Sequence, residues 1–313
     1  MSQQAGQGML NGTLPGRVVD EKEFRFDRLV ITGIDNAPVF AVNVPDMPLQ
    51  EICIFHKSVS SGDAYMALLA DRIEAAIKDH SPLPVVRFAD GEYAFYSGSL
   101  KCNGLYRQAE SVAAIKAAFP AHAEALRYLA ASGILAPLIF PGNTQERRGL
   151  RALFGKKDGR DWAIRFLKFL ARHQIRLAET NYMPFYCVYS YLSSTRFARA
   201  VDGKTVCVVN SDFNEAACAA WFERVGSHPR LVHVPIPASY VATQWDSMRE
   251  EVFRNVPEKP DCFMVGAGVG ALQVCVDVAR RFSAPAIDSG HIINMMNNLE
   301  YKSQGPRLFT FSR

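Results

Sequence analysis

From about residue 61 onward, short apolar runs alternate with longer segments whose apolar residues recur at helical spacing, and this alternation most limits the possible fold. Short apolar runs are typical of strands buried on both faces, and the segments between them are long enough for helical crossovers between parallel strands. The apolar runs are 85–88, 134–140, 205–209, 231–234, 262–265 and 284–287. The segments predicted to be helical are 65–78, 109–130, 160–173, 213–225 and 269–282. The sequence therefore predicts an α/β fold with a Rossmann-like open, mostly parallel sheet and flanking helices.

The residues before this alternation have a different character. Small and polar residues without apolar periodicity dominate residues 1–20, which predicts disorder there. Two β-rich segments, 28–32 and 39–44, are separated by a stretch containing Gly, Asp, Asn and Pro, which is typical of a hairpin. We therefore expect a small β-rich N-terminal extension over 21–60, ahead of a Rossmann-like catalytic domain over 61–313.

Composition narrows the class of protein. The chain has 313 residues, of which 49% are hydrophobic and 21% charged, as in ordinary globular proteins. A net charge of +4 is too small for the strong positive field of a general nucleic-acid binder, so no nucleic-acid partner is expected. The seven cysteines form no Cys-x-x-Cys pair and mostly lie in apolar runs, which predicts reduced core residues in a cytoplasmic protein. No signal-peptide pattern and no apolar run of about 20 residues is found, so secretion and membrane spanning are not expected.

Ligands of open parallel sheets bind beyond the carboxyl ends of the strands, and the first such end carries two acids. Asp90 and Glu92 flank Gly91, which permits a tight turn. Carboxylate oxygens suit Mg²⁺ or Mn²⁺, which commonly bridge one or two carboxylates to a substrate phosphate. Arg87, on the same strand, is able to pair with these acids or reach a phosphate. The plainer interpretation is a turn at Asp90 with Glu92 capping the next helix.

A second strand end, Gly266 to Ala271, contains Gly266, Gly268 and Gly270 between an apolar strand and a helix. Amides at such a helix start are able to face a phosphate or a ribose. The dinucleotide fingerprint needs two residues between its last glycines, whereas only Val269 separates Gly268 from Gly270. The alternative is a compact turn whose glycines serve packing alone.

Two further strand ends are polar. Asp288 and His291 follow the last core strand, where they are able to position an acceptor hydroxyl, contact a nucleotide or orient one another. Asn210 and Ser211 follow another strand and are able to hydrogen-bond a sugar or base. Either group is also explained as an ordinary turn or helix cap.

In this order along the chain, the motifs resemble those of the GT-D type glycosyltransferases. The resemblance is strongest over 85–96 and 261–291, and Ala89 stands where that family more usually has a glycine. It implies a Rossmann-like domain that binds a nucleotide sugar and a divalent metal, with an Asp-x-Glu motif that maps onto Asp90 and Glu92. The implied partners are a nucleotide sugar, with a UDP-sugar as the first expectation, and a glycan or glycoconjugate acceptor.

The mechanism expected from this resemblance is metal-assisted transfer. An ion held by Asp90 and Glu92 offsets charge on the leaving nucleoside diphosphate, and amides of the glycine-rich turn hold the nucleotide. The acceptor hydroxyl needs a base. The sequence leaves that role open among the four candidates Glu92, Asp212, Asp288 and His291.

A basic stretch over residues 147–176 contains ten basic and two acidic residues. Trp162, Phe166 and Phe169 share one helical face, while cations occupy the others, which is typical of a basic amphipathic helix. Such a helix is able to make peripheral contact with the inner face of a membrane. It is equally able to pack its aromatic side against the sheet.

Two other classes of function stay open. A nucleotide- or S-adenosylmethionine-dependent Rossmann enzyme would use the Gly266–Gly270 turn as its cofactor loop, although that loop usually follows the first core strand. A non-catalytic nucleotide- or sugar-binding homologue is also compatible with the sequence. The sequence leaves open whether the chain forms a homo-oligomer.

Overall fold

The computed structural model of the protein describes residues 24–32, 38–41, 51–55, 59, 61–145 and 159–299, and its centre is a six-stranded sheet. The strands are β5 (Leu83–Phe88), β6 (Ile134–Pro137), β7 (Thr205–Asn210), β8 (Arg230–Pro235), β9 (Cys262–Gly266) and β10 (Pro285–Asp288). They lie in the order β6-β5-β10-β9-β7-β8, and every neighbouring pair is parallel. Each predicted apolar run overlaps one strand, so the predicted α/β fold is confirmed, with this sheet wholly parallel.

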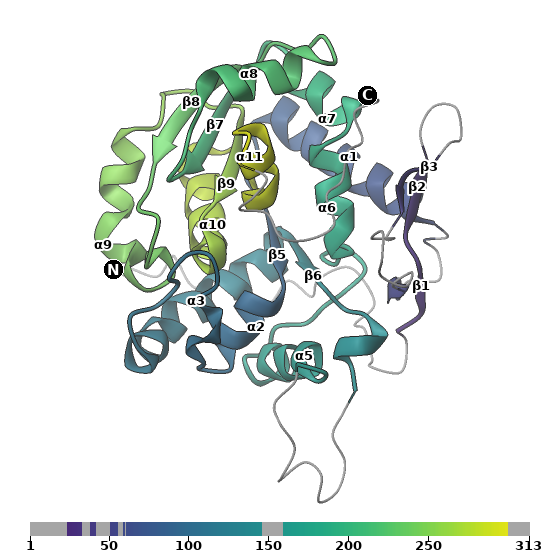
Figure 1. The fold of residues 1–313 in the computed structure, drawn as a ribbon, viewed down its shortest axis with the longest axis vertical. Helices are drawn as coiled ribbons and strands as arrows, with labels where there is room; N and C mark the ends of the chain where they lie inside the picture. The colour runs from purple at the N-terminus through teal and green to yellow at the C-terminus, as the bar shows by residue number, and fades with distance from the viewer. Residues whose placement is uncertain are drawn as a thin grey trace, which may run out of the picture.

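Helices cover both faces of the sheet (Figure 1). One face carries α3 (Val112–Ser132), α9 (Val241–Arg254) and α10 (Ala271–Phe282). The other carries α1 (Gly62–Asp79), α6 (Phe185–Leu192), α7 (Thr195–Ala200), α8 (Glu215–Glu223) and α11 (Gly290–Met296). Connections that step toward β6 cross on the first face and those that step toward β8 cross on the second, as a single handedness of parallel crossovers requires.

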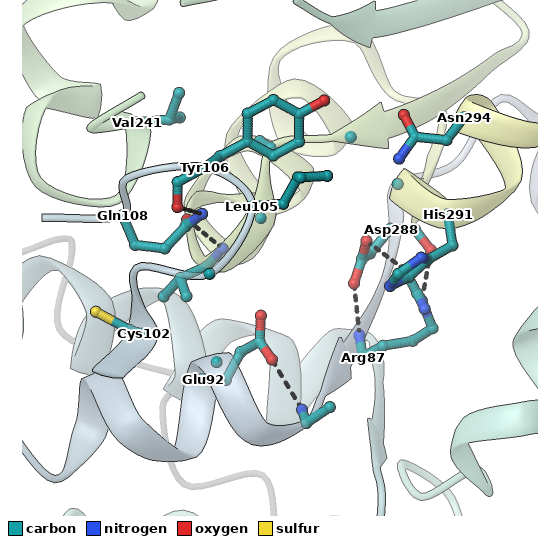
Figure 2. Close-up of a pocket in the computed structure, with 18 of the residues that line it drawn as sticks. Arg87, Glu92, Cys102, Leu105, Tyr106, Gln108, Val241, Asp288, His291 and Asn294 are labelled. Carbon is teal, nitrogen blue, oxygen red and sulfur yellow. Dashed lines mark hydrogen bonds and ion pairs between the residues drawn. The ribbon is translucent and has the colours of Figure 1, made fainter. Parts of the chain in front are cut away.

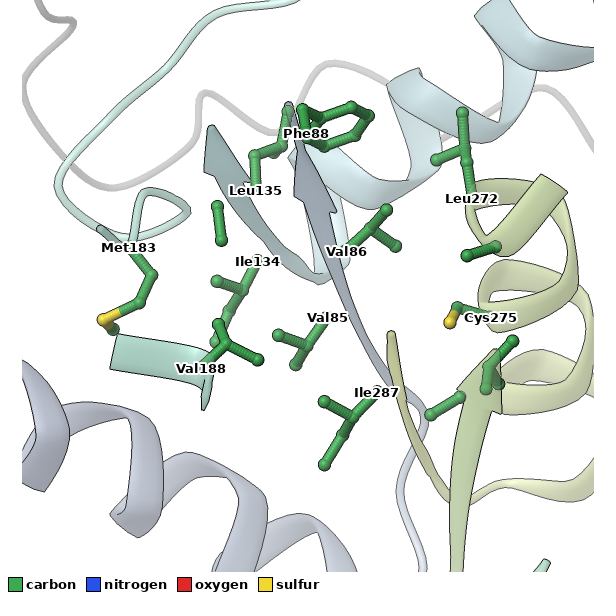
Figure 3. Packing of buried hydrophobic residues seen from close by; sticks show 14 of the residues in the cluster. Val85, Val86, Phe88, Ile134, Leu135, Met183, Val188, Leu272, Cys275 and Ile287 are labelled. Atoms are coloured by element: carbon green, nitrogen blue, oxygen red, sulfur yellow. The ribbon is translucent and has the colours of Figure 1, made fainter. Parts of the chain in front are cut away.

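The core is built by alternate residues of the central strands (Figure 3). Val86 of β5 faces Leu272 and Cys275 of α10, whereas Val85 faces the side of Val188 on α6. All six residues of β5 are buried, which explains why the strand reads as a continuous apolar run. The seven cysteines are all buried and unpaired, as predicted for core residues.

The predicted N-terminal hairpin is confirmed in its described part. β2 (Val30–Thr32) pairs antiparallel with β3 (Pro38–Ala41), and β1 (Phe26–Arg28) pairs antiparallel with β4 (Glu51–Cys53). Two hydrogen bonds join Cys53 to the main sheet region: its amide donates to the Ile139 carbonyl at 2.8 Å, and its carbonyl accepts from the Tyr182 hydroxyl at 2.5 Å. The predicted disorder over residues 1–20 falls outside the described residues.

Helix α5 (Trp162–Arg172) is the described part of the basic amphipathic stretch. Its aromatic side is buried within the protein: Phe166 stacks on Phe88 with ring centroids 4.9 Å apart, and Phe169 lies 4.7 Å from Tyr96. The interpretation in which this face packs internally therefore describes α5, and the face is not available to a bilayer. Residues 147–158 lie outside the described part. Among the described helices, none is both long and apolar enough to cross a membrane.

Candidate active site

A cavity of about 790 Å³ opens at the carboxyl edge of the sheet (Figure 2). Four strands contribute their last residues or the residue before: Arg87 from β5, Asp288 from β10, Gly266 from β9 and Asn210 from β7. Nine predicted site residues line this cavity, namely Arg87, Asp90, Glu92, Asn210, Ser211, Gly266, Gly268, Asp288 and His291. The fold thus brings together residues that lie about two hundred positions apart in the chain.

The acid pair lies on α2 (Asp90–Tyr96), which begins directly after β5. The Glu92 carboxylate turns back to accept a hydrogen bond from the Ala89 amide at 2.8 Å, so the helix-capping interpretation is correct for Glu92. Glu92 nevertheless lines the cavity, as Figure 2 shows. Asp90 is exposed on the same wall, and its carboxylate forms no hydrogen bond with the described residues. Capping and ligand contact are therefore compatible.

Burial destabilises the charged form of these acids. It raises the pKa of Glu92 to about 7, against the opposing effect of the Ala89 amide, and the negative charge of Asp288 adds to the increase. Partial desolvation by the cavity wall also raises the pKa of Asp90, although its side chain stays accessible to solvent. A cation held between the two carboxylates would relieve this cost. No cluster of three or more His, Cys, Asp or Glu side chains suited to a metal occurs among the described residues. An ion at this pair would have to take its remaining ligands from water and substrate phosphate.

Arg87 pairs with Asp288 rather than with the acid pair. Its Nη2 donates to Asp288 Oδ1 at 2.9 Å, its Nε donates to the Asp288 carbonyl at 3.0 Å, and its backbone amide donates to Oδ2 at 3.3 Å. The guanidinium lies 4.0 Å from the ring centroid of Tyr189, a cation–π contact. Both side chains are buried. Because both Asp288 oxygens are engaged, Asp288 fixes the arginine and is poorly placed to act as a base.

His291 is the second residue of α11 and is accessible from the cavity. Its ring lies 5.8 Å from that of Tyr189. Burial by the surrounding protein, helped by the charge of Arg87, lowers the pKa of His291 to about 4. The imidazole is therefore neutral near pH 7 and able to accept a hydrogen bond from a hydroxyl. Within the described residues, no hydrogen bond joins it to Asp288.

Groups of the protein itself occupy two backbone amides of the glycine-rich turn. The Val269 amide donates to Gln108 Oε1 at 2.9 Å, and the Gly270 amide donates to the Ala267 carbonyl at 3.1 Å. Gly268 has a φ of 55°, and a Cβ there would lie 2.5 Å from Gln108 Oε1. Two of the amides expected to face a phosphate are thus already used, which leaves fewer for a nucleotide than the sequence suggested.

Gly270, which was predicted to hold the nucleotide, does not line the cavity, and neither does Asp212, one of the candidate bases. Gly270 lies under α9, where a Cβ would be 2.7 Å from Val241 Cγ1 and 2.9 Å from the Ala242 amide nitrogen. This glycine serves close packing between the turn and α9, as the packing interpretation proposed.

Asn210 and Ser211 shape the end of β7. Asn210 Nδ2 donates to the Asp212 carbonyl at 3.1 Å, and Ser211 Oγ donates to Asp212 Oδ2 at 3.3 Å. The same carboxylate oxygen accepts from the Tyr106 hydroxyl at 3.3 Å. Asp212 therefore links β7 to the loop over the cavity, and its role as a free base is disfavoured.

Several lining residues were not anticipated. Gln108 reaches the glycine-rich turn from the loop before α3, and Phe185, Tyr186 and Tyr189 form the wall contributed by α6. Asn294, from α11, is also in the lining. Neither a motif nor a strand end marks these positions in the sequence.

Comparison with known proteins gives few matches. No protein-family model and no curated protein matches the chain. Two solved structures are similar to it: one is described as the selenomethionine-substituted structure of a domain of unknown function 1792, the other as that highly conserved domain with a distinct glycosyltransferase fold. Each is 17% identical and matches over 76% of this chain and 83% of the other, with TM-scores of 0.45 and 0.46. A likeness of this degree concerns the backbone fold alone.

Proposed function

We propose that the protein is a metal-assisted glycosyltransferase that moves a sugar from a nucleotide-sugar donor to a glycan or glycoconjugate acceptor. The observation that carries this proposal is the pair Asp90 and Glu92, two carboxylates of α2 that line a cavity at the carboxyl edge of a parallel sheet. At about 790 Å³, the cavity falls within the range of roughly 300–1,000 Å³ that is usual for cofactor and substrate sites.

In this proposal, Asp90 and Glu92 hold Mn²⁺ or Mg²⁺ together with the donor diphosphate. Such an ion offsets the negative charge that develops on the leaving nucleoside diphosphate. Arg87, fixed by Asp288, keeps a permanent positive charge on the same wall. His291 accepts a hydrogen bond from the acceptor hydroxyl and orients it. We take UDP-sugars as the first donors to test.

No observation favours the competing S-adenosylmethionine or nucleotide-dependent Rossmann enzyme. Such an enzyme would need the Gly266–Gly270 turn as an open cofactor loop. Instead, Gln108 lies against Gly268 and accepts a hydrogen bond from the Val269 amide. A non-catalytic homologue would not need two carboxylates whose burial raises their pKa beside a buried arginine.

The test is a thermal-shift panel of UDP, GDP, CMP, NAD and S-adenosylmethionine, each with and without Mn²⁺. A ligand at 100 times its Kd stabilises the folded state by about 2.7 kcal/mol, which raises Tm by several degrees. We expect a Mn²⁺-dependent rise with one nucleotide that is lost in Asp90→Asn and in Glu92→Gln.

Asp246→Asn and Glu250→Gln are matched controls, because both carboxylates lie on α9 with side chains 69% and 80% exposed. Both should retain the shift. A Mn²⁺-independent shift with S-adenosylmethionine or NAD would overturn the proposal.

A further inference from the structure

Four large apolar side chains are exposed to solvent among the described residues, namely Leu68, Leu100, Leu105 and Val112, with exposed fractions of 49%, 41%, 60% and 38%. The last three belong to residues 99–112, here called the rim loop, which cover most of the connection from α2 to α3 and the first residue of α3, Val112. Leu105 lines the cavity itself (Figure 2). Only Leu68 lies elsewhere, on α1.

The rim loop has a fixed backbone. Asn103 Oδ1 accepts from the amides of Gln108 at 2.6 Å and Ala109 at 3.1 Å, and the Tyr240 amide donates to the Arg107 carbonyl at 2.7 Å. Its apolar side chains are therefore held outward rather than exposed by loose packing. Three exposed apolar side chains within one short, ordered segment make this segment a candidate for a surface that a partner covers.

The charges of the rim loop indicate what covers it. Lys101 and Arg107 are exposed beside Leu100 and Leu105. The one acid of the segment, Glu110, is turned to α9, where its carboxylate accepts from the Thr243 hydroxyl at 2.8 Å and from Gln244. Leucines interleaved with cations suit a bilayer surface with anionic headgroups, because the apolar groups enter the interface while the cations meet the phosphates.

We propose that the rim loop docks the protein on an anionic lipid bilayer, with Leu100, Leu105 and Val112 entering the headgroup region and Lys101 and Arg107 facing lipid phosphates. The mouth of the cavity then faces the membrane. If the proposed function holds, this orientation implies that the acceptor is a saccharide carried on a membrane lipid. The saccharide would then enter the cavity past Leu105.

The experiment is co-sedimentation of the full chain with vesicles at 150 mM NaCl. One set of vesicles contains phosphatidylcholine with 30% phosphatidylglycerol, and the other contains phosphatidylcholine alone. We expect binding to the anionic vesicles, weakened at least tenfold in the double variant Leu100→Asp/Lys101→Glu. Leu68→Asp is the matched control, an exposed leucine on α1, and should bind like the wild type. Thermal melts establish that both variants fold.

Two results would overturn the docking proposal. One is absence of wild-type binding to anionic vesicles, or equal binding by the double variant and Leu68→Asp. The other is a wild-type dimer in sedimentation velocity that dissociates in the double variant without any vesicle binding, which would make the rim loop a contact between two copies.

A thermal-shift measurement on the same samples tests the proposed function separately. Neither Leu100 nor Lys101 lines the cavity, so the double variant should keep the Mn²⁺-dependent nucleotide shift. Vesicle binding without any nucleotide shift in the wild type would contradict the transferase and leave membrane docking intact.

Discussion

A buried histidine should make the stability of this protein depend on pH. His122 of α3 has no exposed surface and bridges helices α2 and α9. Its Nε2 lies 2.8 Å from the Ala242 carbonyl of α9, and its Nδ1 lies 3.0 Å from the Tyr96 hydroxyl of α2. A carbonyl only accepts, so Nε2 carries the hydrogen and Nδ1 accepts from Tyr96. The ring is thus held neutral.

The size of the effect follows from the pKa of His122. Burial lowers this pKa from 6.5 to about 4, although the Ala242 carbonyl and Asp246 oppose the shift. As pH falls, the unfolded chain therefore binds the proton first, so the stability is intact above pH 6.5 and is lost progressively toward pH 4. Between pH 7.5 and pH 5.0 this one group should cost about 2 kcal/mol of unfolding free energy.

The assay is urea denaturation at those two pH values for the wild type and for His122→Gln, whose amide does not titrate but still donates to a carbonyl. The wild type should lose about 2 kcal/mol more than the variant. Other titrating groups are shared by both proteins and cancel in the difference. His228→Gln, which removes a histidine whose side chain is 72% exposed, serves as the control and should follow the wild type. Equal losses in the wild type and His122→Gln would refute the reasoning.

Three further predictions concern the site. Asp288→Asn leaves the buried Arg87 charge without its partner and should cost about 3–5 kcal/mol in urea denaturation, with an unchanged stability contradicting a buried ion pair. Glu92→Gln should raise Tm more at pH 8 than at pH 5, because the folded-state pKa of Glu92 is raised from 4.5 to about 7 and the stability of its protonated form is lost as pH rises through this window; a lower Tm at pH 8 would count against it. Gly268→Ala should lower stability by about 1–2 kcal/mol because of its left-handed backbone, whereas Gly91→Ala, whose Cβ would find its nearest neighbour at 3.9 Å, should be tolerated; equal effects in thermal melts would refute this.

The sheet was predictable because most of its strands are buried on both faces and are short, largely apolar runs. Helix α6 was not, because all eight of its residues are buried and it has no polar face to give a helical period. Helix α9 was predictable but was not predicted. Its apolar residues recur at helical spacing, namely Val241, Trp245, Met248 and Val252.

The same contrast holds within the site. Parallel strands bring their carboxyl ends to one edge, so Arg87, Asp90, Asp288 and Asn210 were found from their place after each strand. Gln108 comes from a loop whose path depends on tertiary contacts, and no local pattern links it to the glycine-rich turn. For the same reason, the partner of Arg87 was identified only in the structure.

The most direct test of the central proposal is release of nucleoside diphosphate from UDP-sugars, and then from other nucleotide sugars, by the purified protein with and without Mn²⁺. The account predicts Mn²⁺-dependent release that falls on the order of a hundredfold or more in Asp90→Asn and in Glu92→Gln, with folding intact. Asp246→Asn and Glu250→Gln should turn over normally. Normal turnover in both acid-pair variants would contradict the role given to Asp90 and Glu92.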